Sequence, residues 1–87
     1  MNKKDIYIYS FYRFKRLHNI NRIKIDLDEL IKKFSLLGTI LISDEGINGS
    51  ISGNINNLEK FFSLMKRKLR IKKLSLKISN INFTPFN

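Results

Sequence analysis

The 87-residue sequence contains no cysteine, no tryptophan, one proline and four glycines. Without cysteine the chain can form no disulfide, thiolate nucleophile or thiolate metal site, and such a composition is compatible with a reducing compartment. Its single histidine, His18, has no cluster of carboxylates beside it in the sequence, so we expect no metal site, no cofactor and no catalytic residue. These absences favour a domain that binds a partner over one that catalyses a reaction.

Long hydrophobic runs are also missing. No apolar stretch approaches the roughly 20 residues that cross a membrane, and residues 1–5 do not open a signal-peptide pattern. Hydrophobic residues nevertheless make up 43% of the chain, including seven Phe and three Tyr, which is enough for one core. We therefore expect a single domain over residues 1–87 that is soluble and cytoplasmic and has no membrane partner.

Acidic residues are scarce, with seven Asp and Glu against 17 Lys and Arg, for a net charge of +10. Part of this excess reflects composition, because Ile, Lys and Asn supply 36 of the 87 residues, a mixture typical of AT-rich genomes. The distribution is more informative, since residues 60–87 hold eight basic side chains and no acid. This region favours an anionic partner such as RNA. The candidate phosphate contacts are Lys66, Arg67, Lys68, Arg70, Lys72, Lys73 and Lys77.

The first half of the sequence predicts a strand followed by a helix. Ile6–Phe14 is dense in β-branched and aromatic residues, as strands are, and the polar, basic Lys15–Lys24 is expected to be a loop. A helix is predicted over about 26–37, with Asp26 as its N-cap and Gly38 at its end. Its apolar positions at helical spacing are Leu27, Leu30, Ile31 and Phe34.

The second half completes an order of β-α-β-β-α-β. Strands are predicted at Thr39–Ser43, Gly49–Gly53 and Leu74–Ile78, with a turn at Asp44–Asn48. Asn54 is placed to cap a second helix over about 55–69. This order predicts an α+β ferredoxin-like fold, in which two helices cover one face of a four-stranded antiparallel sheet ordered 4-1-3-2.

Alternation along the strands sorts their side chains between a helix-covered face and an open face. We expect the helices to cover Ile6, Ile8, Ile40, Ile42, Ile51, Leu74, Leu76 and Ile78. The open face is then predicted to carry an aromatic row, Tyr7, Tyr9 and Phe11, among hydroxyl residues and Lys77. Such a row can stack RNA bases. The alternative is that another domain, or the tail with Phe83 and Phe86, covers it.

Ferredoxin-like domains include acylphosphatases, which bind phosphate in a glycine-rich loop after the first strand. The corresponding segment here, Lys15–Lys24, contains no glycine, although Arg13, Arg16 and Asn48 are available. Without a cradle of backbone N–H groups an arginine is only a basic side chain. We therefore expect no acylphosphatase activity.

Two segments of the chain resemble a known family. They are Gly38–Gly53 (GTILISDEGINGSISG) and Ser10–Arg13 (SFYR), which is followed by Phe14. The segment Thr84–Phe86 near the end of the chain also resembles the family. The chain resembles the N-terminal, acylphosphatase-like domain of the rhodanese-related tRNA uridine hydroxylases. The residues that match the family's E-G-I-N-G turn are Glu45, Gly46, Ile47, Asn48 and Gly49, which form a second candidate site.

The resemblance implies a parent protein that uses oxygen to hydroxylate the wobble uridine of tRNA, with a catalytic cysteine in a rhodanese domain. This chain has no cysteine and no rhodanese domain, so the resemblance implies a supporting role. The expected partners are tRNA and the rhodanese domain of the parent protein. The alternative is a protein-docking domain whose open sheet face packs on another domain or subunit, with its basic charge incidental.

Overall fold

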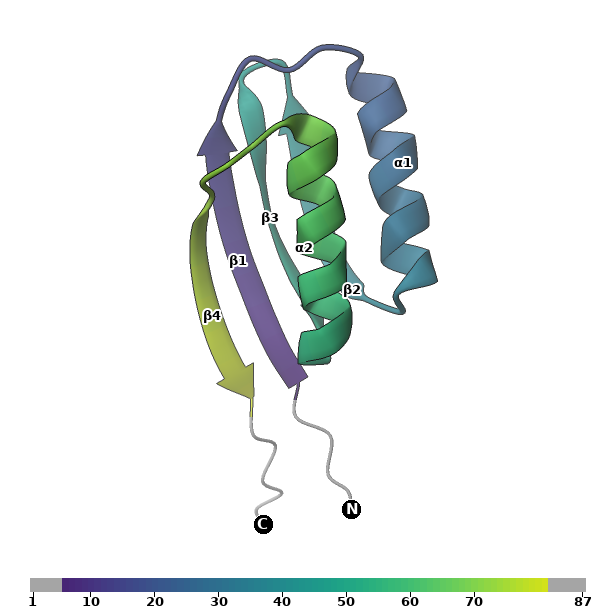
Figure 1. Ribbon diagram of the computed structural model, residues 1–87, viewed down its shortest axis with the longest axis vertical. Coiled ribbons are helices and arrows are strands. Elements are labelled where there is room, and N and C mark those ends of the chain that lie inside the picture. The colour runs from purple at the N-terminus through teal and green to yellow at the C-terminus, as the bar shows by residue number, and fades with distance from the viewer. Residues whose placement is uncertain (1–5, 82–87) are drawn as a thin grey trace.

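The computed structural model describes residues 6–81, which form strands and helices in the order β-α-β-β-α-β (Figure 1). The predicted tail contacts of Phe83 and Phe86, and the Thr84–Phe86 segment, lie outside these residues. The elements are β1 (Ile6–Phe14), α1 (Ile20–Lys33), β2 (Leu37–Ser43), β3 (Gly46–Gly53), α2 (Ile55–Leu69) and β4 (Ser75–Ile81). The predicted order of elements is therefore confirmed.

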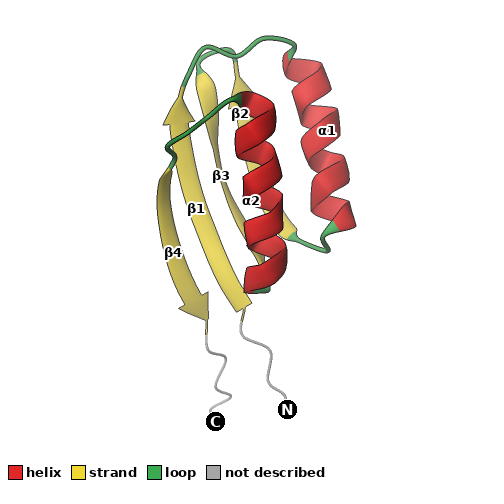
Figure 2. Ribbon diagram, in the orientation of Figure 1, coloured by secondary structure: helices red, strands yellow, loops and turns green. Residues whose placement is uncertain are grey.

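The four strands form one sheet in the order β2-β3-β1-β4, and each neighbouring pair is antiparallel. This is the predicted order 4-1-3-2, and it confirms the ferredoxin-like α+β fold. Both helices lie on the same side of the sheet (Figure 2). Within residues 6–81 no element covers the other face, which we call the open face. Neither α1 nor α2 has the length and apolar composition of a membrane-spanning helix.

The core lies between the sheet and the helices, with α2 at its centre. Five side chains are completely or almost completely buried there: Leu27, Ile51, Leu58, Phe61 and Met65. The start of α2 is as predicted, because the Asn57 backbone N–H donates to the Asn54 side chain at 2.8 Å. The apolar stripe of this helix therefore forms the largest part of the core.

The predicted start of α1 is wrong. The helix begins at Ile20, because Ile20 and Ile23 extend the apolar stripe of Leu27 into the segment that we expected to be a loop. Asn19 adopts a left-handed conformation at the N-cap and forms no side-chain capping hydrogen bond. Asp26 is consequently not a cap but an interior residue of the helix, where its carboxylate forms ion pairs.

The predicted end of α1 at Gly38 is also wrong. The helix ends at Lys33, and Ser35 adopts the left-handed conformation (φ 54°) that glycine more often supplies at this point. The Leu36 N–H donates to the Ile31 carbonyl at 2.9 Å and closes the last turn. Gly38 lies within β2 instead, where a Cβ would sit 2.1 Å from the Ser50 carbonyl oxygen. The glycine therefore serves sheet packing and not the helix end.

The aromatic row predicted for the open face lies on the helix side. Tyr9 and Phe11 are each 3% exposed, and their ring centroids lie 5.1 and 5.0 Å from that of Phe62 on α2. Tyr7 is partly buried against the same core. Burial also raises the pKa of the Tyr9 phenol, with smaller contributions from Glu59 and Tyr7. The prediction of base stacking on these three rings is therefore wrong.

The inversion of faces is confined to β1. Residues paired directly across strands share a face, and Tyr9 pairs with Ile51 of β3 and with Ile78 of β4. The predicted helix-side positions of the other strands therefore hold, whereas Ile6 and Ile8 lie on the open face. The open face of β1 carries Ile6, Ile8, Ser10, Tyr12 and Phe14.

Candidate nucleic-acid interface

Three chain connections gather at one end of the molecule, at the top of Figure 1. They are the β1–α1 loop, the β2–β3 turn and the α2–β4 connection. The first two are joined by backbone hydrogen bonds from Lys15 N–H to the Glu45 carbonyl at 3.0 Å and from Leu17 N–H to the Asp44 carbonyl at 3.1 Å. The Leu17 side chain is buried in the core and anchors the loop. We call residues 13–22, 43–46 and 66–74 the loop end.

The predicted basic cluster lies at this loop end, with one exception. Lys66, Arg67 and Lys68 form the last turn of α2, and Arg70, Lys72 and Lys73 follow in the connection to β4. Ile71 is buried among them and fixes this connection to the core. Lys77 lies apart on β4, where it pairs with Ser10 and shares the open face.

Arg70 occupies an unfavourable backbone conformation. Its φ and ψ of 57° and 46° are left-handed, which glycine adopts at helix ends with little cost. The Arg70 N–H donates to the Arg67 carbonyl at 3.2 Å, and the Ile71 N–H donates to the Lys66 carbonyl at 2.8 Å. These bonds close α2 while the Arg70 side chain remains exposed. An arginine thus occupies a position at which glycine would be easier to accommodate.

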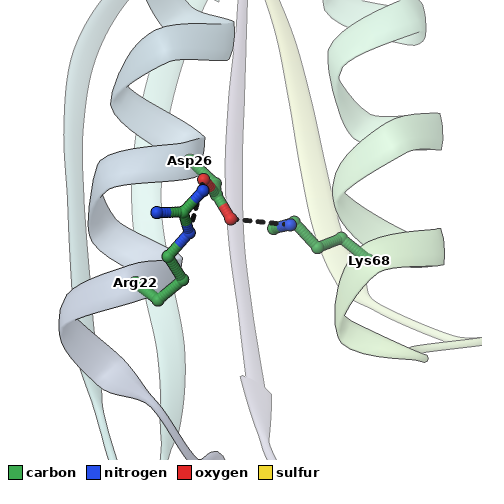
Figure 3. Close-up of polar contacts among 3 residues, drawn as sticks. All are labelled: Arg22, Asp26 and Lys68. Atoms are coloured by element: carbon green, nitrogen blue, oxygen red, sulfur yellow. Dashed lines mark ion pairs between the residues drawn. The ribbon is translucent and has the colours of Figure 1, made fainter.

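Lys68 differs from the rest of the cluster because its charge is already paired. Its Nζ lies 2.7 Å from one Asp26 carboxylate oxygen, and the Arg22 Nε lies 3.3 Å from the other (Figure 3). The hydrogen bond from Lys68 lowers the pKa of Asp26, aided by Arg22 and opposed by partial desolvation of the carboxyl group. This ion pair joins α1 to α2, so Lys68 is less available to a phosphate than its neighbours.

Sequence reasoning missed four basic residues that the fold brings to the loop end. Arg13 and the loop residues Lys15 and Arg16 arrive from β1, and Arg22 arrives from the first turn of α1. The loop end thus holds ten Lys and Arg against two acids, Asp44 and Glu45. The predicted topology carried the missing signal, because it places the connection after the first strand beside the one after the second helix.

The five residues of the E-G-I-N-G match are divided between a turn and a strand. Only Asp44 and Glu45 form the β2–β3 turn, and β3 begins at Gly46. The Glu45 backbone N–H donates to the Ser43 hydroxyl at 3.2 Å. Gly46 has a φ of 154°, and a Cβ there would lie 2.3 Å from the Arg13 carbonyl oxygen. The glycine therefore permits β1 and β3 to approach each other at this position.

A surface cavity of about 360 Å³ lies where β1 ends beside the β2–β3 turn. It brings together the two sequence segments that carry the family resemblance, SFYR with Phe14 and E-G-I-N-G. Its lining residues are Tyr12, Arg13, Phe14, Ser43, Glu45, Gly46, Ile47 and Asn48. The two aromatic side chains in this lining are exposed and were not among the predicted site residues.

Comparison with solved structures supports the fold. The de novo designed protein Ferredog-Diesel superimposes with a TM-score of 0.59, covering 91% of this chain and 87% of the designed one. The sequences are 10% identical, so this likeness concerns the fold alone.

Comparison with known sequences identifies the family. The chain is 38% identical over 81 residues to the tRNA uridine(34) hydroxylase of Pelagibacter ubique, and 38% over 80 residues to that of Wolbachia sp. subsp. Brugia malayi. It is 30% identical over 84 residues to the enzyme of the same name from Legionella pneumophila. These matches cover 92%, 92% and 97% of this chain but only 27%, 30% and 33% of the relatives. Residues 6–87 match the UPF0176 acylphosphatase-like domain, and the chain belongs to that family.

Proposed function

We propose that this domain binds tRNA through its loop end and supports, without catalysing it, the hydroxylation of a tRNA uridine by a rhodanese domain. The observation that carries this proposal is the gathering of ten basic side chains at one end of the fold, of which, within residues 6–81, only Arg22 and Lys68 are paired with Asp26. The names of the relatives, tRNA uridine(34) hydroxylase, supply the class of nucleic acid. The chain's lack of cysteine supports a role in binding.

The arrangement of these cations suits a phosphate backbone better than it suits a single small anion. They lie on the end of α2, on the connection that follows it and on the β1–α1 loop, so they can face several phosphates. Each phosphate neutralised by Lys or Arg releases counterions, which makes binding strongly dependent on salt. A single small domain offers few such contacts, and we expect a dissociation constant of about 10⁻⁴–10⁻⁶ M at physiological salt.

The test compares two charge reversals of equal size. Arg67→Glu with Arg70→Glu changes two exposed residues of the loop end, and Lys32→Glu with Lys33→Glu changes the exposed last turn of α1 at the opposite end. Binding of unmodified tRNA is measured by fluorescence anisotropy at several salt concentrations. We expect a log–log salt slope of roughly three to five for the wild type. The first reversal should abolish binding, and the second should weaken it much less.

Equal weakening by both reversals would show that only net charge attracts RNA. The tRNA-binding proposal would then fail, because any protein of charge +10 associates with RNA at low salt. Circular dichroism of both variants verifies that the fold is intact, which we expect because the four substituted side chains are exposed.

A second candidate function, docking of another protein domain, is favoured by the edge strand β2. Leu37 and Leu41 are 74% and 61% exposed on the open face. Apolar side chains of this size on an edge strand are suited to contact with a neighbouring domain. The test adds a purified rhodanese domain to the chain and follows backbone NMR shifts. Shifts confined to β2 and lost in Leu37→Ser with Leu41→Ser would support docking, and unchanged spectra would contradict it.

A further inference from the structure

The cavity beside the β2–β3 turn has features that phosphate binding alone does not use. Two aromatic side chains, Tyr12 and Phe14, line it and are 52% and 81% exposed. Their ring centroids lie 5.8 Å apart at an interplanar angle of 58°, so they form an exposed aromatic pair at the end of β1. Exposed aromatic rings on a sheet are the usual platform for unpaired bases in RNA-binding domains.

Polar groups suited to a base edge surround this aromatic pair. Asn48 pairs directly with Tyr12 across β1 and β3, so its side chain shares the open face with the Tyr12 ring. Its amide offers both donors and an acceptor, the Ser43 hydroxyl offers both, and the Glu45 carboxylate accepts. The Ser43 hydroxyl already accepts from the Glu45 backbone N–H, and a base edge can bond the remaining polar capacity of these groups, which a purely apolar partner cannot.

The charges around the cavity complement a phosphate backbone. Among the described strand residues that share the open face, Lys77 carries the single charge, and the rest are apolar, hydroxyl, amide or glycine. Arg13 and Glu45 both line the cavity, and Lys15 and Arg16 continue the chain from Arg13. The cavity therefore joins the basic loop end to an almost uncharged aromatic surface. This combination of flat apolar rings and flanking cations matches single-stranded RNA.

We propose that this cavity binds one unpaired nucleotide of the RNA, with its base stacked on one ring of the Tyr12 and Phe14 pair and in contact with the other, and with its edge contacted by Asn48. The inference rests on the proposed tRNA-binding function and adds the part of the RNA that is recognised. A volume of about 360 Å³ lies within the range of roughly 300–1,000 Å³ typical of small-ligand sites.

The experiment measures binding of single-stranded hexauridine and of an RNA duplex to the intact chain by fluorescence anisotropy. Tyr12→Ala with Phe14→Ala should weaken hexauridine binding roughly tenfold or more, because each stacked base contributes substantially to affinity. The salt slope should stay unchanged, since no cation is removed. Duplex affinity should also stay unchanged, because paired bases are not available for stacking. Hexauridine should shift the Tyr12 and Phe14 ring protons in NMR spectra.

Matched controls separate stacking from general damage to the surface. Tyr12→Phe keeps the ring and should retain hexauridine binding. Leu41→Ala removes an exposed apolar side chain from the same face but outside the cavity, and it should also retain binding. Both aromatic side chains are exposed, so we expect their alanine variants to fold normally.

The outcomes distinguish this inference from the function on which it rests. If the aromatic variants bind hexauridine as well as the wild type, while Arg67→Glu with Arg70→Glu does not bind, the nucleotide site is wrong and tRNA binding stands. If the wild type binds neither RNA at low salt, both proposals fail. If the aromatic substitutions alter only self-association or binding of a rhodanese domain, the cavity is a protein contact and the inference is overturned.

Discussion

The two faces of the sheet use the same residue types for different purposes, and β1 contributes to both. On the helix side Tyr9 and Phe11 pack against Phe62 and are almost completely buried. On the open side Tyr12 and Phe14 lie exposed around a cavity. The aromatic residues of β1 that lie under a helix therefore stabilise the fold. Those on the face that no helix covers remain accessible to a ligand.

The polar residues of the two faces differ as well. Among the described residues, the phenol of Tyr9 is the one polar group carried by a buried core side chain, and no charged side chain is buried there. The open face carries hydroxyl residues on neighbouring strands, such as Ser10 and Ser50, whose hydroxyl oxygens lie 3.3 Å apart. These side chains keep hydrogen-bonding capacity at a surface that α1 and α2 do not use. The helix face is built for packing, and the open face keeps groups that a ligand can contact.

The largest expected effect tests this comparison directly through two phenylalanines of β1. Phe11→Ala should lower the free energy of unfolding by about 3–5 kcal/mol, because it removes a buried ring packed edge-on against Phe62. Phe14→Ala should change it by less than about 0.5 kcal/mol, because that ring is exposed. Urea denaturation followed by circular dichroism measures both.

A milder substitution guards against complete unfolding of the alanine variant. Phe11→Leu keeps most of the buried volume and should cost less than Phe11→Ala but clearly more than Phe14→Ala. If substitutions at positions 11 and 14 lowered the free energy of unfolding equally, the assignment of the two faces would be contradicted.

The arrangement of strands and helices was predictable from the sequence because the local signals agree. The helical spacing of α2, its Asn54 cap and the β-branched strands all favour the same fold. Which side of β1 faces the helices was not predictable from the sequence. Both alternating sets of its side chains are apolar, one with Tyr7, Tyr9 and Phe11 and the other with Ile6 and Ile8. Ser10 held the decisive signal, since it shares a face with Ile8 and Tyr12 and makes that side the more polar one.

The site was predictable only where it is local in the sequence. The cluster on α2 and its connection is continuous along the chain, whereas Arg13, Lys15 and Arg16 join it only through the fold. The cavity required the actual register of β1 on β3, which places Asn48 opposite Tyr12. The predicted bounds of α1 were wrong because Asn19 precedes the helix without a side-chain capping hydrogen bond, and because Ser35 supplies the left-handed conformation that glycine usually provides after a helix.

A smaller effect is expected at Arg70, where stability and binding oppose each other. Arg70→Gly should raise the free energy of unfolding by about 1 kcal/mol, because glycine adopts the left-handed conformation without steric cost. The same change should weaken tRNA binding by removing a loop-end cation. Urea denaturation and anisotropy measure the two quantities.

Arg67→Gly provides a comparison for the Arg70 substitution. It removes an equal charge from a helical position and should destabilise the chain. A loss of stability in Arg70→Gly would show that the arginine makes contacts that outweigh its strain.

The smallest effect concerns Asp26, whose carboxylate holds Lys68 and Arg22. Its pKa is lower in the folded chain than in the unfolded chain, so its contribution to stability is present above the ordinary Asp value of about 3.9. That contribution is lost as the pH falls through the lowered pKa.

Asp26→Asn should therefore be less stable than the wild type at neutral pH, and the difference should vanish in strong acid. Asp28→Asn, an exposed change on the same helix, should show little pH-dependent difference. Urea denaturation across the acidic range measures both. Because Asp26→Asn also frees the charge of Lys68, it should strengthen tRNA binding slightly at neutral pH, as anisotropy would show. A difference in stability that persists in strong acid would mean that the Asp26 carboxylate charge is not its source.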